Sequence, residues 1–169
     1  MERMVVRVQN IKKLSAMFWT GIALGIVLSV LSLFLVLPRL MFTESVSRHG
    51  FEETGALIEK KAAEMKWGIP HQYDLQATLN SKGFEVQPVR VYSLCKPDVA
   101  YLILSSEKSR IASALMPCRI SVYTKPDGKT YVSRLNTTLL SCFMGKGIRQ
   151  AMKQAASENE LILRGIVES

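Results

Sequence analysis

The longest hydrophobic pattern in the chain is an uncharged run from Leu14 to Leu37, interrupted only by Ala, Gly, Ser and Thr. As an α-helix this run would be about 36 Å long, enough to cross a hydrocarbon core of about 30 Å. A cleaved signal peptide is the competing interpretation. Its apolar region is shorter, roughly 7–15 residues, and ends at a small-x-small site, whereas this run ends in Val36-Leu37-Pro38. We therefore expect an uncleaved membrane anchor.

Charge on the two sides of this run predicts its orientation. Four basic residues precede it: Arg3, Arg7, Lys12 and Lys13. The positive-inside rule keeps this side in the cytoplasm, so the rest of the chain is expected in the periplasm of a bacterium, anchored in the inner membrane. The predicted organisation is a cytoplasmic N-terminus (1–13), one transmembrane helix (14–37), a juxtamembrane linker or first strand (38–49) and a soluble domain (50–169).

A stripe of small residues follows one side of the predicted transmembrane helix. Gly21, Gly25 and Ser29 are spaced at i, i+4 and i+8. Such a stripe lets two helices approach closely in lipid, although Gly and Ser are also common in membrane helices that have no partner. The stripe predicts that this helix associates laterally with another helix in the bilayer, while its other sides contact lipid.

After Met41 the chain alternates between short strand-like and helical patterns. The clearest helix has Phe51, Gly55, Ile58, Ala62 and Met65 on one face. Further helices are predicted at 75–81, 98–104 and 139–158, the last one burying Phe143, Ile148, Met152 and Ala155. Strands are predicted at 41–48, 69–74 and 86–94, with a hairpin formed by 119–123 and 131–135 around a Pro-Asp-Gly turn. This order predicts an α+β fold: a two-layer domain with a mixed, partly antiparallel sheet and packed helices.

Charge excludes one class of partner. The net charge of +8 over 169 residues divides evenly between the first 40 residues and the remaining 129. The soluble part is therefore only mildly basic, and nucleic acid is not expected as a partner because backbone binding needs clustered positive charge. His71 is expected on a strand face as an ordinary polar residue, and the sequence has no standard hydrolase or zinc motif.

Three cysteines are the residues best suited to chemistry. Cys95 ends a predicted strand and Cys118 begins another, so the two can face one another as a disulfide, a redox pair or a soft-metal site. The alternative is that both pack as small apolar side chains. Cys142 is expected to lie farther away. Lys96 and Arg119 each follow one of the paired cysteines, and a cation directed at a thiol would lower its pKa.

Several segments together resemble a family known as domain of unknown function 302. They are Gly50-Phe51-Glu52-Glu53-Thr54, Asp74-Leu75-Gln76-Ala77-Thr78-Leu79, Cys95-Lys96-Pro97-Asp98-Val99-Ala100 and Leu115-Met116-Pro117-Cys118-Arg119. The resemblance implies a compact α+β domain that dimerises, with Asp74, Cys95, Pro97, Pro117 and Cys118 at the signature positions. The family usually has Asn after each cysteine, where this chain has Lys96 and Arg119. The family carries no established reaction or cofactor.

These observations favour a binding or accessory domain over an enzyme. The first hypothesis is a single-pass, membrane-anchored periplasmic domain that works as a dimer or as a small subunit of a membrane complex. The predicted ligand or redox site consists of Cys95, Cys118, Asp74, Lys96 and Arg119. The second hypothesis is thiol redox chemistry, sulfur transfer or soft-metal handling through the two cysteines.

Overall fold

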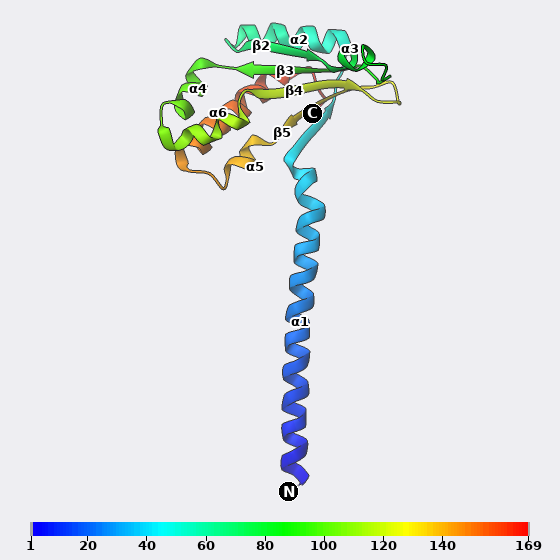
Figure 1. The fold of residues 1–169 in the computed structure, drawn as a ribbon, viewed down its shortest axis with the longest axis vertical. Coiled ribbons are helices and arrows are strands. Elements are labelled where there is room, and N and C mark those ends of the chain that lie inside the picture. The colour runs from blue at the N-terminus through cyan, green and yellow to red at the C-terminus, as the bar shows by residue number, and fades with distance from the viewer. Residues whose placement is uncertain (1, 169) are drawn as a thin grey trace. The chain divides into compact units, whose positions relative to one another are not determined.

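The computed structural model describes the backbone of residues 2–168 and the side chains of residues 17–168. The chain divides into two units, Met1–Arg39 and Leu40–Ser169. The first unit belongs to one long helix, α1 (Glu2–Met41), drawn in blue in Figure 1. The second unit contains the remaining helices and strands.

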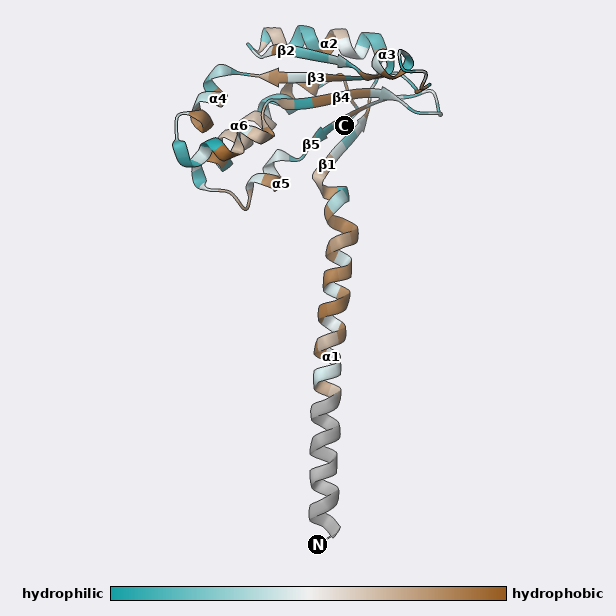
Figure 2. Ribbon diagram, in the orientation of Figure 1, coloured by the Kyte–Doolittle hydropathy of each residue, from teal (hydrophilic) through white to brown (hydrophobic). Residues whose placement is uncertain are grey.

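Helix α1 contains a segment, Met17–Met41, that is long and apolar enough to cross a membrane. The brown colouring of this helix in Figure 2 follows that segment. A signal sequence shares both features. The apolar segment extends four residues past the predicted end at Leu37, because Pro38 and Arg39 continue the helix. The basic residues that predict orientation lie before residue 17, outside the described side chains.

The second unit is an α+β domain with a five-stranded sheet in the order β1-β5-β4-β3-β2. Every described strand pair is antiparallel, so the α+β prediction is confirmed but the sheet is not mixed. The connections β2–β3, β3–β4 and β4–β5 each join antiparallel neighbours. The connection from β1 to β2 instead crosses from one edge of the sheet to the other and joins two strands that run parallel. The strands are β1 (Phe42–Val46), β2 (Gly68–Asp74), β3 (Val89–Cys95), β4 (Cys118–Thr124) and β5 (Thr130–Leu135).

Helices connect these strands and end the chain. They are α2 (Phe51–Glu64), α3 (Leu75–Asn80), α4 (Pro97–Leu104), the 3-10 helix η1 (Glu107–Leu115), α5 (Thr137–Ser141) and α6 (Lys146–Leu163). The predicted final helix at 139–158 is wrong in one respect, because Cys142–Gly145 separates α5 from α6. This break changes the helical phase, and Phe143 is therefore 89% exposed instead of buried. Helix η1 was not predicted.

The register of the sheet divides its side chains between two faces. In the antiparallel ladder Tyr92 lies opposite Ile120, and Leu94 lies opposite Cys118. Directly opposed residues point to the same side, and neighbours along a strand point to opposite sides. One face, which we call the helix-covered face, therefore carries Arg90, Tyr92, Leu94, Cys118, Ile120, Val122, Val132 and Arg134. The other, the open face, carries Val91, Ser93, Cys95, Arg119, Ser121, Tyr131 and Ser133.

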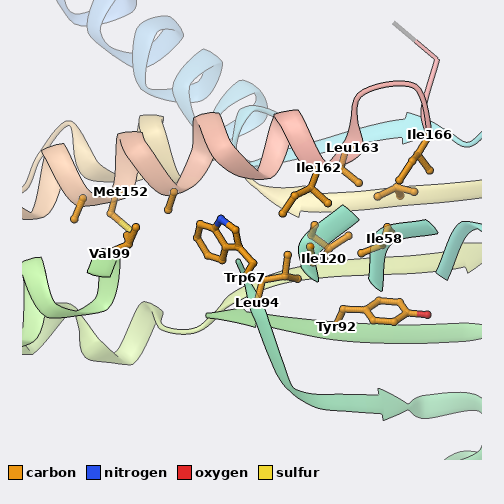
Figure 3. Packing of buried hydrophobic residues seen from close by; sticks show 14 of the residues in the cluster. Ile58, Trp67, Tyr92, Leu94, Val99, Ile120, Met152, Ile162, Leu163 and Ile166 are labelled. Carbon is orange, nitrogen blue, oxygen red and sulfur yellow. The ribbon is translucent and has the colours of Figure 1, made fainter. Parts of the chain in front are cut away.

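The hydrophobic core lies between the helix-covered face and helices α2 and α6. Leu94 and Ile120 of the sheet belong to the same buried cluster as Met152 and Ile162 of α6, and Ile162 lies beside Ile120 (Figure 3). Helix α2 approaches the sheet at Gly55, where an added Cβ would meet the ring and hydroxyl group of Tyr92. Cys118 packs against this cluster, whereas the half-buried Cys95 does not belong to it.

Candidate functional site

The two cysteines of the predicted pair are neighbours in the backbone but belong to different faces. Cys118 lies opposite Leu94, one residue before Cys95. Strand spacing puts the two Cα atoms about 6 Å apart. The alternation of side chains nevertheless directs Cys118 toward the helices and Cys95 toward the open face. Cys95, Cys118 and the exposed Cys142 are all free thiols in the described part of the chain.

Cys118 lies in a largely apolar environment at the edge of the core. It packs against the core cluster. Burial raises the pKa of the Cys118 thiol, a contact with the Asn159 side chain opposes that effect, and the nearby Cys95 adds to it. Arg119 is not among the groups that shift the pKa of this thiol. Arg119 directly follows Cys118 in β4, so its side chain leaves from the other face of the sheet.

A pocket of about 220 Å³ opens beside Cys118, between the start of β4, the end of β5 and α6. We call it the Cys118 pocket. Its polar wall is held by Arg134, which donates two hydrogen bonds to Glu160 at 2.6 and 2.7 Å. The remaining lining includes Met116, Pro117, Asn136 and Asn159. The pocket has room for several water molecules, so it suits a small ligand.

Asn159 is the polar group of this pocket with unmet bonding capacity. Its side chain is only 9% exposed. Its Oδ1 atom is buried and has no hydrogen-bond partner among the described residues. A buried acceptor without a donor costs about 1–3 kcal/mol, which a bound molecule with an N–H or O–H group would recover.

Lys96 belongs to a second polar group on the helix side. Its Nζ donates to Glu158 Oε2 at 2.7 Å, and the same oxygen accepts a bond from Trp67 Nε1 at 2.8 Å. Burial tends to raise the pKa of Glu158, but hydrogen bonds from Lys96, Gln154 and Trp67 lower it overall. Lys96 therefore ties the start of α4 to α6, instead of acting on the Cys95 thiol beside it.

Asp74 lies at the opposite end of the sheet from the cysteines. It pairs with Arg90 in the β2–β3 ladder, five residues from Cys95 and so about 17 Å away along the strand. Its carboxylate accepts the backbone N–H of Ala77 at 2.8 Å and caps α3. This bond is the main reason why the pKa of Asp74 is lowered. Its role at this position is structural, and the structure does not bring it to the cysteines.

The residues that complete the Cys118 pocket were not predicted. Asn159 carried a usable signal, because it follows Ile148, Met152 and Ala155 at the spacing of the buried face of α6. A polar residue at a core position marks a group that needs a partner. Arg134 and Glu160 carried no such signal, since their pairing depends on how α6 crosses β5. Among residues 17–168, no group of three or more His, Cys, Asp or Glu side chains is arranged to hold a metal.

The small-residue stripe lies along the apolar part of α1. An added Cβ at Gly21 or Gly25 would meet no atom within 4 Å, apart from the chain neighbours and the helix backbone. The Ser29 hydroxyl donates to the Gly25 carbonyl at 2.8 Å. This bond satisfies the hydroxyl within the helix, as lipid requires. Association through the stripe stays a prediction.

The fold and the pocket define a small α+β domain, one face of whose sheet is covered by helices, that follows an apolar helix. The chain belongs to the family described as "Domain of unknown function DUF302", which it matches over residues 42–168. This confirms the resemblance found in the sequence. A crystal structure of an uncharacterized conserved DUF302 protein from Bacillus stearothermophilus has the same fold, with a TM-score of 0.67 and 19% identity, covering 75% of this chain and 98% of that one. No curated protein matches the sequence.

Proposed function

We propose that this protein is a membrane-anchored domain that binds a small polar molecule outside the cytoplasm. The observation that carries the proposal is the Cys118 pocket, in which Asn159 Oδ1 is buried without a partner. The apolar segment of α1 supports the anchor. The basic residues that precede this segment support a periplasmic location.

Binding fits the groups around the pocket better than catalysis does. The pKa of Cys118 is raised, so at neutral pH this residue is a thiol and not the thiolate that acts as a nucleophile. The carboxylate of Glu160 is held by Arg134. A ligand would therefore meet fixed hydrogen-bonding groups, without a free base to take a proton from it.

Filling the pocket tests ligand binding. Ala156 lines the Cys118 pocket, whereas Ala63 is exposed on α2 and provides a matched control. We expect native mass spectrometry of the full chain, purified in mild detergent, to show a bound small molecule in the wild type and in Ala63→Phe. The Ala156→Phe variant should lose it. An added mass that persists in Ala156→Phe would contradict binding in this pocket, and the absence of any added mass in the wild type would contradict the proposal itself.

The anchor and its orientation are tested separately. An alkaline phosphatase reporter fused after Ser169 is expected to be active, because this enzyme needs an oxidising compartment for its disulfides. A fluorescent protein that folds only in the cytoplasm should stay dark at the same position. The reverse pattern would place the domain inside the cell, and release of the domain into the soluble fraction would replace the anchor with a cleaved signal sequence.

We further propose that the protein works as a homodimer or as a subunit of a membrane complex. The open face supports this proposal, because Val91 and Tyr131 are only half-buried there. The stripe on α1 supports it independently. Replacing Gly25 with Leu should weaken assembly in detergent if the helices meet at this stripe. Val27→Leu, a change outside the stripe, is the control. If Gly25→Leu assembles like the wild type, the helices do not meet at this stripe, and any dimer is held together by the α+β domain alone.

One observation favours a second function, soft-metal handling. A small apolar cavity of about 20 Å³ is lined by four residues that carry sulfur: Cys95, Cys118, Met116 and Met152. Thiolate and thioether ligands select Cu(I). Competition with a colorimetric Cu(I) chelator tests this, with Cys118→Ser expected to lose the metal and Cys142→Ser to keep it. Equal affinity in both variants would exclude the cavity as a copper site.

A further inference from the structure

A row of three polar residues crosses the open face of the sheet. His71 of β2 pairs with Ser93 of β3, and Ser93 pairs with Arg119 of β4. Directly opposed side chains in an antiparallel sheet have Cβ atoms about 5 Å apart and point to the same side. The three side chains therefore lie next to one another, although 48 residues separate His71 from Arg119 in the sequence.

The middle residue of this row has unmet bonding capacity. Ser93 is only 1% exposed. Its hydroxyl has no hydrogen-bond partner among the described residues. Serine hydroxyls donate as well as accept, and burial without a partner costs about 1–3 kcal/mol. The open face thus contains a buried hydroxyl without a partner at the register position between His71 and Arg119.

Arg119 differs from the other cations of the sheet. Arg90 is bound by Glu52, Arg134 by Glu160 and Lys125 by Glu44. Among residues 17–168 no carboxylate lies within ion-pair distance of the Arg119 guanidinium. The acidic residue of the same face, Glu44, is already held by Lys125. The fork of N–H donors on Arg119 is therefore available to an anion from outside the chain.

We propose that His71, Ser93 and Arg119 form a binding site for an oxyanion, such as a sulfate, phosphate or carboxylate group. Arg119 donates a bidentate pair of hydrogen bonds, the Ser93 hydroxyl donates from below, and the imidazole of His71 donates from the other side. All three are donors at a single anion, which is the arrangement that a sulfate or phosphate group requires. Arg119 also lines the Cys118 pocket, whereas His71 and Ser93 lie outside its lining, so the three-residue site is tested through sulfate protection and not through occupancy of that pocket.

Cys95 provides a local reporter for this site. It follows Ser93 by two residues in β3, about 7 Å along the strand in the register of the same face, and at the end of the strand it also borders the small cavity that Cys118 lines. We expect sulfate to slow the alkylation of Cys95 by iodoacetamide in the full chain in detergent, at constant ionic strength and relative to chloride. The protection should be several-fold in the wild type and absent in Arg119→Gln. His71→Gln and Ser93→Ala should each reduce it.

Two controls separate a specific site from a general effect of sulfate. Arg48→Gln removes an exposed arginine away from the row and should keep the protection of Cys95. Alkylation of the exposed Cys142, read from its own peptide in the same sample, should respond equally to both salts in all variants. Equal protection of Cys95 in the wild type and Arg119→Gln, or none in the wild type with sulfate or phosphate, would overturn the proposal.

The source of the oxyanion is distinguished by reconstitution. In phosphatidylcholine nanodiscs free phosphate should protect Cys95. If a lipid headgroup is the natural ligand, phosphatidylglycerol nanodiscs protect Cys95 without added phosphate, and Arg119→Gln abolishes that protection. If the ligand is a soluble anion, the two lipids give the same rate and only added phosphate changes it. Protection by phosphatidylglycerol that survives Arg119→Gln would contradict the site.

Discussion

The two faces of the sheet differ in how deeply their side chains are buried, although residues adjacent in the sequence alternate between them. On the helix-covered face, Tyr92, Ile120 and Val132 are fully buried. On the open face their neighbours Val91, Ser121 and Tyr131 stay half-exposed. At these three positions a step of one residue along the strand moves a side chain from the core to a half-exposed surface, whereas Ser93 is buried although it belongs to the open face. The same step separates the residues of the predicted site.

Because side chains alternate between the faces, each cysteine is separated from the cation that follows it in the sequence. Sequence adjacency pairs Cys95 with Lys96 and Cys118 with Arg119. The structure instead puts Cys118 and Lys96 on the helix side, where Lys96 bonds to Glu158, while the register assigns Cys95 and Arg119 to the open face. A thiol and a cation that follow each other in a strand cannot act on one another unless the strand is interrupted between them.

The largest difference between the faces is expected in stability. Ile120 is fully buried on the helix-covered face, and the next residue, Ser121, lies on the open face. Ile120→Ala should destabilise the domain by about 2–5 kcal/mol through lost burial and a cavity. Ser121→Ala should change the stability by no more than about 0.5 kcal/mol. Urea unfolding followed by circular dichroism measures both, and equal effects would show that both faces are buried.

A smaller loss is expected where α2 meets the helix-covered face. A Cβ at Gly55 would overlap the hydroxyl group of Tyr92, so Gly55→Ala should cost about 1–3 kcal/mol in spite of its better helix propensity. Removing that hydroxyl should relieve the overlap. Gly55→Ala in a Tyr92→Phe background is therefore expected to be neutral or slightly stabilising. A loss of the same size in both backgrounds would assign the cost to another contact.

The bond between Lys96 and Glu158 predicts how stability on the helix side depends on pH. The pKa of Glu158 is lowered in the folded protein, so its contribution is complete above the ordinary glutamate pKa and is lost as the pH falls through the folded value. Glu158→Gln should cost about 1–2 kcal/mol at neutral pH. The gap between wild type and variant should close below about pH 4. A gap that is constant from pH 7 to pH 3 would exclude a charged Glu158 as its cause.

Local patterns predicted most of the fold because they depend on neighbours in the chain. The helical spacing from Phe51 to Met65 and the Pro126-Asp127-Gly128 turn each specify an element without reference to the rest. The prediction that Phe143 is buried was wrong because it also used only local spacing. Its spacing suits one continuous helix, but the chain leaves the helical conformation after Ser141 and begins α6 at Lys146.

The candidate sites could be predicted only in part because they depend on register. Cys95 and Cys118 were expected at neighbouring strand ends, and they are neighbours in the β3–β4 ladder. Which face each one occupies follows from the pairing of Leu94 with Cys118, and single-strand patterns do not contain that information. The row of His71, Ser93 and Arg119 is invisible in the sequence for the same reason, since three strands have to align to create it.

The smallest expected difference concerns the cysteines themselves, and it tests the assignment of faces directly. Cys118 packs against the core, so Cys118→Ser should cost about 1–2 kcal/mol by placing a hydroxyl in a largely apolar site. Cys95→Ser should cost no more than about 0.5 kcal/mol, because the open face tolerates a polar atom. The raised pKa of Cys118 also predicts that it is alkylated most slowly of the three cysteines at pH 8, since the thiolate is the reacting form. Thermal unfolding and peptide mass spectrometry provide the two readouts. If Cys95→Ser costs as much as Cys118→Ser and the two thiols react at the same rate, both point into the core, and the distinction between the two faces fails at this end of the sheet.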